Sequence, residues 1–206
     1  MSPRTFKTTG VTKEEISSDA KNALLKKIAE KIQSYMENGL GEQTFDEWHK
    51  ELCEYFLNGD SQIKGLKGLL KDAGKDSKQA TFGKAQKIIN MTFKYMYCFD
   101  DADQYCSKFE PCHMPLDSYI LDWFFYHYKK EWRHPINGKA KLTRTGTYKL
   151  PVWSDLKYAQ GGSDIIPQYR EIQEWIEGHL GKKQISRLEA EFLIWWESRN
   201  DEPYTY

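Results

Sequence analysis

The sequence predicts an all-α protein, and three observations carry this prediction. Apolar residues recur at spacings of three and four along several segments, most of these segments follow a helix-capping signal, and no segment keeps the alternation typical of strands. A chain of 206 residues is long enough to bury a core. We therefore expect a compact multi-helix fold that contains a helix-hairpin-helix-like pair.

The segments predict a single domain over residues 1–206. Its main helical core covers residues 11–132 and contains the candidate hairpin at 61–99. Residues 133–163 are rich in Pro, Gly and Thr, which predicts a loop-rich insert, and C-terminal helices follow at 164–200.

Capping boxes predict the starts of the first two helices. Thr12 and Glu15 open a segment that keeps helical spacing to about Met36. Thr44 and Glu47 open the next, which ends at Asn58 before a glycine. Side-chain oxygens at the cap satisfy backbone N–H groups that have no partner within the helix.

The candidate hairpin contains the next two helices. We expect the first to begin at Ser61, to include Ile63–Leu70 and to end near Gly74. A polar turn follows, and residues 82–99 then predict about four helical turns. The two helices and their turn form the predicted helix-hairpin-helix-like pair.

The second hairpin helix has two distinct faces. Lysines align on one face at helical spacing, while apolar residues form a second face suited to a core; the first stripe contains Lys84, Lys87, Met91, Lys94 and Cys98, the second Ala85, Ile89, Phe93 and Met96. Residues 61–99 contain eight lysines and two acids, although the whole chain is neutral. This local charge suits phosphate contacts or a solvated basic face.

Pro115 predicts the start of another helix, because proline favours the first helical turn. Asp117 then falls in the first turn of a helix from Leu116 to about Trp132, where the helix dipole favours a negative charge. Further along, Ser163 and Asp164 predict the start of a helix over 165–179. A last capping box, Ser186 with Glu189, predicts a helix to about Asn200.

Two short motifs resemble the helix-hairpin-helix DNA glycosylase superfamily. They are Lys87-Ile88-Ile89-Asn90 and Met114-Pro115-Leu116-Asp117, and Lys94 with the long gap between them is most similar to the archaeal 8-oxoguanine glycosylase branch. The resemblance covers about Gly65–Leu121. It implies a base-excision enzyme with lyase activity that acts on oxidised purine, with Lys87 as Schiff-base nucleophile and Asp117 as the assisting carboxylate.

The same resemblance implies duplex DNA with a damaged base as partner. We expect no cofactor. The residues expected to contact substrate or DNA are Gly83, Lys84, Asn90, Lys94, His113, Trp123 and Trp153. The two tryptophans are candidates for stacking on an extruded base, and Trp123 belongs to an aromatic run that also suits a core. Lys84 competes with Lys87 as nucleophile. In a separate departure from the family pattern, Gly83 alone stands where the family has a Gly-x-Gly turn.

Two other classes remain open: a non-enzymatic interaction or regulatory protein, whose lysine stripe pairs with the acidic residues 100–103, and a nuclease using the basic face. The spacing of Cys98, Cys106, Cys112 and His113 does not match a metal knuckle, so we expect no metal. We further expect a cytoplasmic monomer with reduced thiols and no membrane span.

Overall fold

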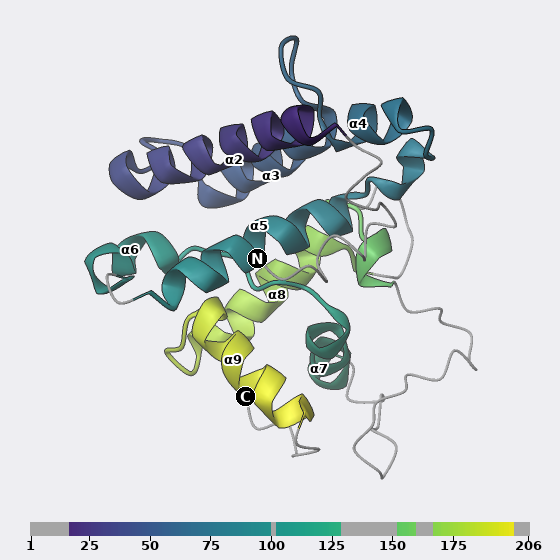
Figure 1. The fold of residues 1–206 in the computed structure, drawn as a ribbon. Coiled ribbons are helices and arrows are strands. Elements are labelled where there is room, and N and C mark those ends of the chain that lie inside the picture. Colours follow the sequence, from purple (N-terminus) through teal and green to yellow (C-terminus); the bar gives the residue numbers. More distant parts are fainter. Residues whose placement is uncertain (1–16, 100–101, 129–151, 160–166, 200–206) are drawn as a thin grey trace, which may run out of the picture. The chain divides into compact units, whose positions relative to one another are not determined.

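The computed structural model describes residues 17–99, 102–128, 152–159 and 167–199 (Figure 1). These residues form eight α-helices and no β-strand, which confirms the predicted all-α class. Contacts divide the chain into two units, 1–89 and 90–206, and the boundary lies inside helix α5 (Phe82–Tyr97). The predicted single domain stays a prediction.

The first unit opens with α2 (Ser18–Asn38) and α3 (Phe45–Asn58), which lie side by side (Figure 1). The predicted capping box at the start of α3 is confirmed: the Thr44 side chain accepts from the backbone N–H of Glu47, and the Glu47 carboxylate accepts from that of Thr44. Apolar side chains at helical spacing form the core, among them Leu24, Ile28, Ile32, Leu52 and Phe56.

The third helix begins later than the sequence predicts. Helix α4 covers Leu66–Asp72, whereas we expected a start at Ser61. The cause is Asp60, whose carboxylate accepts hydrogen bonds from the backbone N–H groups of Gln62 and Ile63, both at 2.8 Å. Such a side-chain turn competes with helix formation, so the chain forms a closed loop before α4 starts.

Backbone closes tightly on backbone at the base of this loop. Gly59 has a φ of 70°, and a Cβ at Gly65 would overlap the backbone of Asn58 and Gly59. We expect Gly65→Ala to lower the free energy of unfolding by about 1–3 kcal/mol, as overpacking does. Gly178→Ala is the matched control, because nothing lies near its Cβ and alanine favours a helix interior. Urea unfolding measures both, and equal stabilities would contradict this account.

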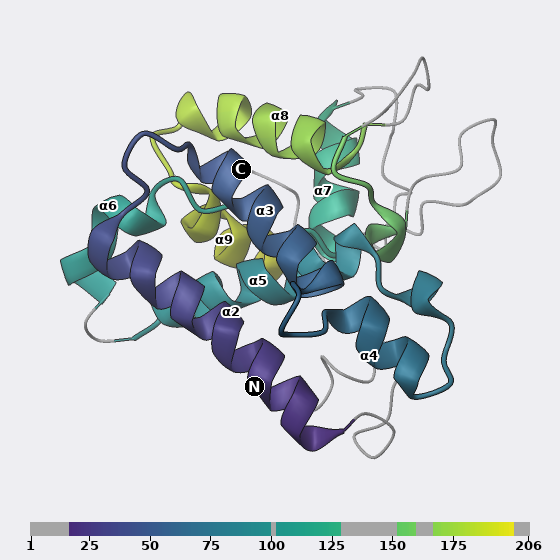
Figure 2. The same ribbon diagram turned by 90° about the horizontal axis from the view of Figure 1, so that it is seen from above.

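Helix α4 is followed by a turn and by the 3-10 helix η1 (Ser77–Gln79), which packs on α4 (Figure 2). Gly74 ends α4 with a φ of 69°, and the N–H of Lys75 donates to the carbonyl of Leu70. Helix α5 then starts at Phe82, and its predicted apolar stripe is buried at Ala85, Ile89 and Phe93. That α4 and α5 form a helix-hairpin-helix pair stays a prediction.

The second unit contains the remaining helices. They are η2 (Ala102–Tyr105), α6 (Cys106–Phe109), α7 (Ser118–Tyr128), η3 (Trp153–Asp155), α8 (Tyr169–Gly181) and α9 (Arg187–Arg199). Helix α9 packs against both α7 and α8. The Ser186–Glu189 capping box at the start of α9 is confirmed, with the two side chains 2.8 Å apart.

Two helix starts differ from expectation. Helix α8 starts at Tyr169 rather than at residue 165, because Pro167 disfavours helical geometry in the residue before it and Gln168 provides the cap. Helix α7 starts at Ser118, so Asp117 precedes it rather than lying in its first turn. The predicted cap at Thr12 and most of the insert at 133–163 lie outside the described residues.

Candidate functional site

The start of α5 carries three of the predicted site residues. The hydroxyl of Thr81 accepts from the backbone N–H of Lys84 at 3.3 Å and caps the helix. Gly83 is buried, and its carbonyl accepts from the side chain of Gln86 at 3.0 Å. Lys84 and Lys87 are half-buried. All of these residues belong to the first unit.

Asp117 caps helix α7. Its Oδ1 accepts hydrogen bonds from the backbone N–H groups of Tyr119 at 2.9 Å and of Ile120 at 3.1 Å. This geometry fixes the carboxylate at the positive end of the α7 dipole. Asp117 is half-buried and belongs to the second unit. Its predicted part in chemistry stays a prediction.

The structure brings two predicted substrate-contact residues together through a third residue. The Asn90 side-chain nitrogen donates to the Tyr169 hydroxyl at 2.9 Å and to the carbonyl of Met114 at 3.3 Å. The same hydroxyl lies 2.8 Å from Nδ1 of His113. All four residues are buried, so Asn90 and His113 form an internal network rather than an exposed surface.

Gln173 of α8 completes this network. Its Oε1 accepts from the backbone N–H of Met114 at 3.2 Å, and its Nε2 donates to the Met114 carbonyl at 2.6 Å. One side-chain amide therefore binds both polar groups of the same residue, as a neighbouring strand would. Met114 lies three residues before Asp117, so the network fixes the segment that leads to the carboxylate.

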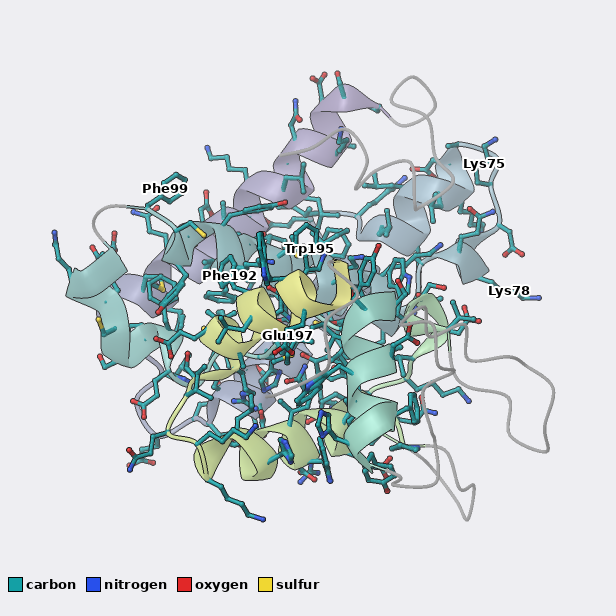
Figure 3. The ribbon with its side chains drawn as sticks, turned by 90° about the horizontal axis from the view of Figure 1, so that it is seen from below. Lys75, Lys78, Phe99, Phe192, Trp195 and Glu197 are labelled. Atoms are coloured by element: carbon teal, nitrogen blue, oxygen red, sulfur yellow. The ribbon has the colours of Figure 1, made fainter. Side chains whose placement is uncertain are left out.

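Lys94 lies inside a contact between α5 and α9. Its amine pairs with the carboxylate of Glu191, and the exposed side-chain fractions are 13% and 2% respectively. The same amine lies 4.4 Å from the ring centre of Phe192 and 5.9 Å from that of Trp195. Figure 3 marks these two aromatic residues on α9. Lys94 thus contributes a buried ion pair and cation–π contacts within the second unit.

Trp123 is fully buried in an aromatic and histidine cluster between α7 and α8, in agreement with the core interpretation of its sequence run. Its ring contacts those of His127 and Trp175 at centroid distances of 5.2 and 6.0 Å. The ring centroids of His127 and His179 lie 5.2 Å apart, and the His179 ring stacks on that of Trp175. Trp153 lies apart from this cluster in sequence, half-buried in η3.

Two side chains on α7 have strongly shifted pKa values. Burial, and the charge of Asp117, raise the pKa of Asp122 to about 7. Burial, and the positive charges of His179 and Lys183, lower the pKa of His127 to about 4. Asp122 therefore exchanges its proton near neutral pH, while His127 stays neutral there.

These shifts predict opposite pH dependences of stability. The unfolded state binds the His127 proton more tightly than the folded state, so this residue's contribution to stability is complete above pH 6.5 and is lost as the pH falls towards about 4. Asp122 behaves inversely, because its raised pKa favours the folded state at low pH and this gain is lost between pH 3.8 and about 7.

We therefore expect His127→Gln to gain stability relative to wild type as the pH falls, and Asp122→Asn to gain as it rises. Each change should reach about 1–2 kcal/mol, less than the full shift because both groups are partly solvated. Urea unfolding between pH 4 and 8 measures this. Two variants whose stabilities track wild type at every pH would contradict the assignment.

Sequence reasoning missed four residues that organise these contacts: Asp122, Tyr169, Gln173 and Glu191. Three of them have partners that are distant in sequence: Tyr169 lies 79 positions from Asn90, Gln173 lies 59 from Met114, and Glu191 pairs with Lys94. Asp122 instead responds to the charge of Asp117, five residues before it. A local signal existed only for α8, where Tyr169 and Gln173 are four residues apart and must share one helix face.

Within the described parts of the chain, no three His, Cys, Asp or Glu side chains gather to hold a metal ion. Nor does any helix there combine the length and the apolar character that a membrane crossing requires. Comparisons of the chain with protein-family models, with curated proteins and with solved structures gave no match.

Proposed function

We propose that this protein excises oxidised purine, of which 8-oxoguanine is the type, from duplex DNA and then cleaves the strand as a lyase. One observation carries the proposal: Asn90, one helical turn after Lys87 on α5, donates a hydrogen bond to the carbonyl of Met114, three residues before Asp117. Asn90, Met114 and Asp117 all belong to the second unit, so this hydrogen bond fixes the segment that carries the candidate carboxylate. The choice of Lys87 as the candidate amine rests on the resemblance of its sequence motif.

In this proposal the Lys87 amine, in its neutral form, attacks C1′ of the damaged nucleotide. A C1′–N bond forms, the bond between C1′ and the base breaks, and the base leaves with the electron pair of that bond. The departing base takes a proton from the new C1′–N group. The C1′–O4′ bond then breaks, O4′ takes up a proton and a Schiff base forms. Loss of a proton from C2′ expels the 3′ phosphate and cleaves the strand. Lys84 is the alternative nucleophile on the same face of α5.

Asp117 supports this chemistry electrostatically. The sugar develops positive charge as the base departs, and a carboxylate held at a fixed position stabilises that charge without having to reorganise. The two backbone hydrogen bonds to its Oδ1 provide that fixed position. Asp117 is therefore the group expected to stabilise the transition state.

Lysines around α4 and η1 suit contacts with the DNA phosphates. Lys67, Lys71 and Lys78 are exposed, Lys75 is half-buried, and Figure 3 marks Lys75 and Lys78. Lys64 pairs with Asp72 at 2.7 Å, and the Lys67 amine donates to the side chain of Asn58 at 3.0 Å. Such a run of cations gives affinity without sequence preference. We propose a cytoplasmic monomer that binds duplex DNA through this surface.

The test is borohydride trapping on duplex DNA that contains a single 8-oxoguanine. We expect a covalent complex with the lesion duplex and none with the matched undamaged duplex, because the reductant fixes only a Schiff base. Lys50→Gln is a suitable control, since Lys50 is an exposed partner of Glu54 on α3. Absence of any adduct with the wild-type protein would remove the proposal.

A second candidate is a non-enzymatic interaction protein, and two exposed aromatic side chains favour it. Phe99 and Trp196 are 65% and 61% exposed, and aromatic residues are enriched where proteins bind partners. The acidic residues 100 and 101, which this alternative pairs with the lysine stripe, lie outside the described residues.

Salt dependence separates the two candidates. If DNA is the partner, we expect its affinity to fall steeply between 50 and 200 mM salt, by about 10³-fold for six phosphate contacts. Replacing Lys71 and Lys78 by Gln should lower the slope of log affinity against log salt by about 2. Fluorescence anisotropy measures both. Weak binding with a flat salt response would favour the interaction protein.

A further inference from the structure

The segment from His113 to Asp117 is held at almost every position. The N–H of Met114 donates to Gln173, and the Met114 carbonyl accepts from both Gln173 and Asn90. Pro115 fixes its own φ and restricts the backbone of Met114 before it, and Leu116 is fully buried. The last residue of the segment, Asp117, is the cap of α7.

The hydrogen-bond roles in this network follow from chemistry. The Met114 carbonyl can only accept, so the side-chain nitrogen of Asn90 must face it. That nitrogen has a second hydrogen, which it donates to the Tyr169 hydroxyl. The same hydroxyl lies 2.8 Å from Nδ1 of His113, and which of these two groups donates depends on the imidazole tautomer.

We propose that Asn90, Tyr169 and Gln173 are positioning residues. Asn90 and Gln173 hold the backbone of Met114 directly, and Tyr169 acts through its bond to Asn90, so that the Asp117 carboxylate keeps its orientation at the start of α7. This inference rests on the proposed function for its catalytic meaning. Tyr169 and Gln173 share one face of α8. Asn90, on α5, donates to the Met114 carbonyl to which Gln173 also donates. Side chains from two helices therefore hydrogen-bond to the backbone of one residue, Met114, at both its N–H and its carbonyl.

The competing interpretation is that these side chains only satisfy buried polar groups. Every member of the network is buried, so any replacement will also lower overall stability. A useful test must therefore separate loss of stability from loss of orientation. Gln86 offers the matched control, because it is another fully buried glutamine that donates to a backbone carbonyl, that of Gly83 in the first unit.

The first measurement is amide hydrogen exchange in Gln173→Met, Tyr169→Phe and Gln86→Met. We expect the two network variants to speed exchange at the N–H of Ile120, which donates to Asp117, by about tenfold or more through local opening. The N–H of Glu47, which donates to Thr44, should keep its wild-type rate. Gln86→Met should leave Ile120 unchanged. Wild-type exchange at Ile120 in both network variants would overturn the inference.

The second measurement is the single-turnover excision rate at saturating lesion DNA, with and without Asp117→Asn. We expect Gln173→Met to lower the rate about 10–100-fold when Asp117 is present and less than about threefold when it is absent, because the network acts through the carboxylate. DNA affinity should not change. An equal loss in both backgrounds would overturn the positioning role.

The two arms also separate this inference from the proposed function. If the wild-type protein excises no base, the proposed function falls, and hydrogen exchange alone decides whether the network orients Asp117. If excision occurs while exchange at Ile120 is insensitive to Gln173→Met, the proposed function stands and the positioning inference falls.

Discussion

We expect Lys87→Gln to abolish the borohydride-trapped complex with lesion DNA and to lower the single-turnover excision rate by a factor on the order of 10³ or more. Glutamine has about the length of lysine but no nucleophilic amine, so it leaves the surface of α5 intact while removing the attacking group. The expected size is large because the covalent step has no substitute once the amine is lost.

Two neighbours make this prediction specific. Lys84→Gln changes the competing amine, one turn earlier on α5, and should retain the adduct. Asp117→Asn should slow excision about 10²–10³-fold while leaving some adduct, because it weakens stabilisation of the sugar's charge and keeps the nucleophile. An adduct that survives Lys87→Gln but disappears in Lys84→Gln would assign the chemistry to Lys84.

The second large effect concerns stability. We expect Lys94→Met to lower the free energy of unfolding by about 3–5 kcal/mol, because it leaves the carboxylate of Glu191 buried without its cation. The substitution also removes the contacts of the Lys94 amine with the rings of Phe192 and Trp195. Urea unfolding of the whole protein, followed by tryptophan fluorescence, measures the change.

The double variant Lys94→Met/Glu191→Leu provides the control. Replacing a whole buried ion pair by apolar groups is often neutral, so we expect the double variant to be more stable than Lys94→Met alone. If Lys94→Met costs less than about 1 kcal/mol, as an exposed pair would, the buried pair does not stabilise the fold as described.

Sequence signals predicted a helix start correctly where the hydrogen bonds that stabilise this start join residues close together in the sequence. The boxes Thr44–Glu47 and Ser186–Glu189 formed as predicted, because each satisfies its hydrogen bonds within four residues. The start of α4 was predicted wrongly, because the side-chain turn at Asp60 won over helix formation. Helix α8 also starts later than predicted, because Pro167 disfavours helical geometry in the residue before it.

The contacts of the candidate site were not predictable in this way. The sequence singled out Asn90, His113 and Asp117, but nothing near them indicates Tyr169 or Gln173, whose contacts exist only once α8 packs. Glu191 pairs with Lys94 across 97 positions for the same reason. Residue types and helical spacing locate candidate groups, while tertiary packing decides which of them meet.

The most direct test of the central claim is to locate the trapped adduct in the chain. After borohydride reduction on 8-oxoguanine duplex, nuclease trimming and trypsin digestion, mass spectrometry should place the reduced sugar on Lys87, and trypsin should fail to cleave there. A reduced sugar on any other lysine, Lys84 and Lys94 included, would contradict the assignment of Lys87 as the nucleophile.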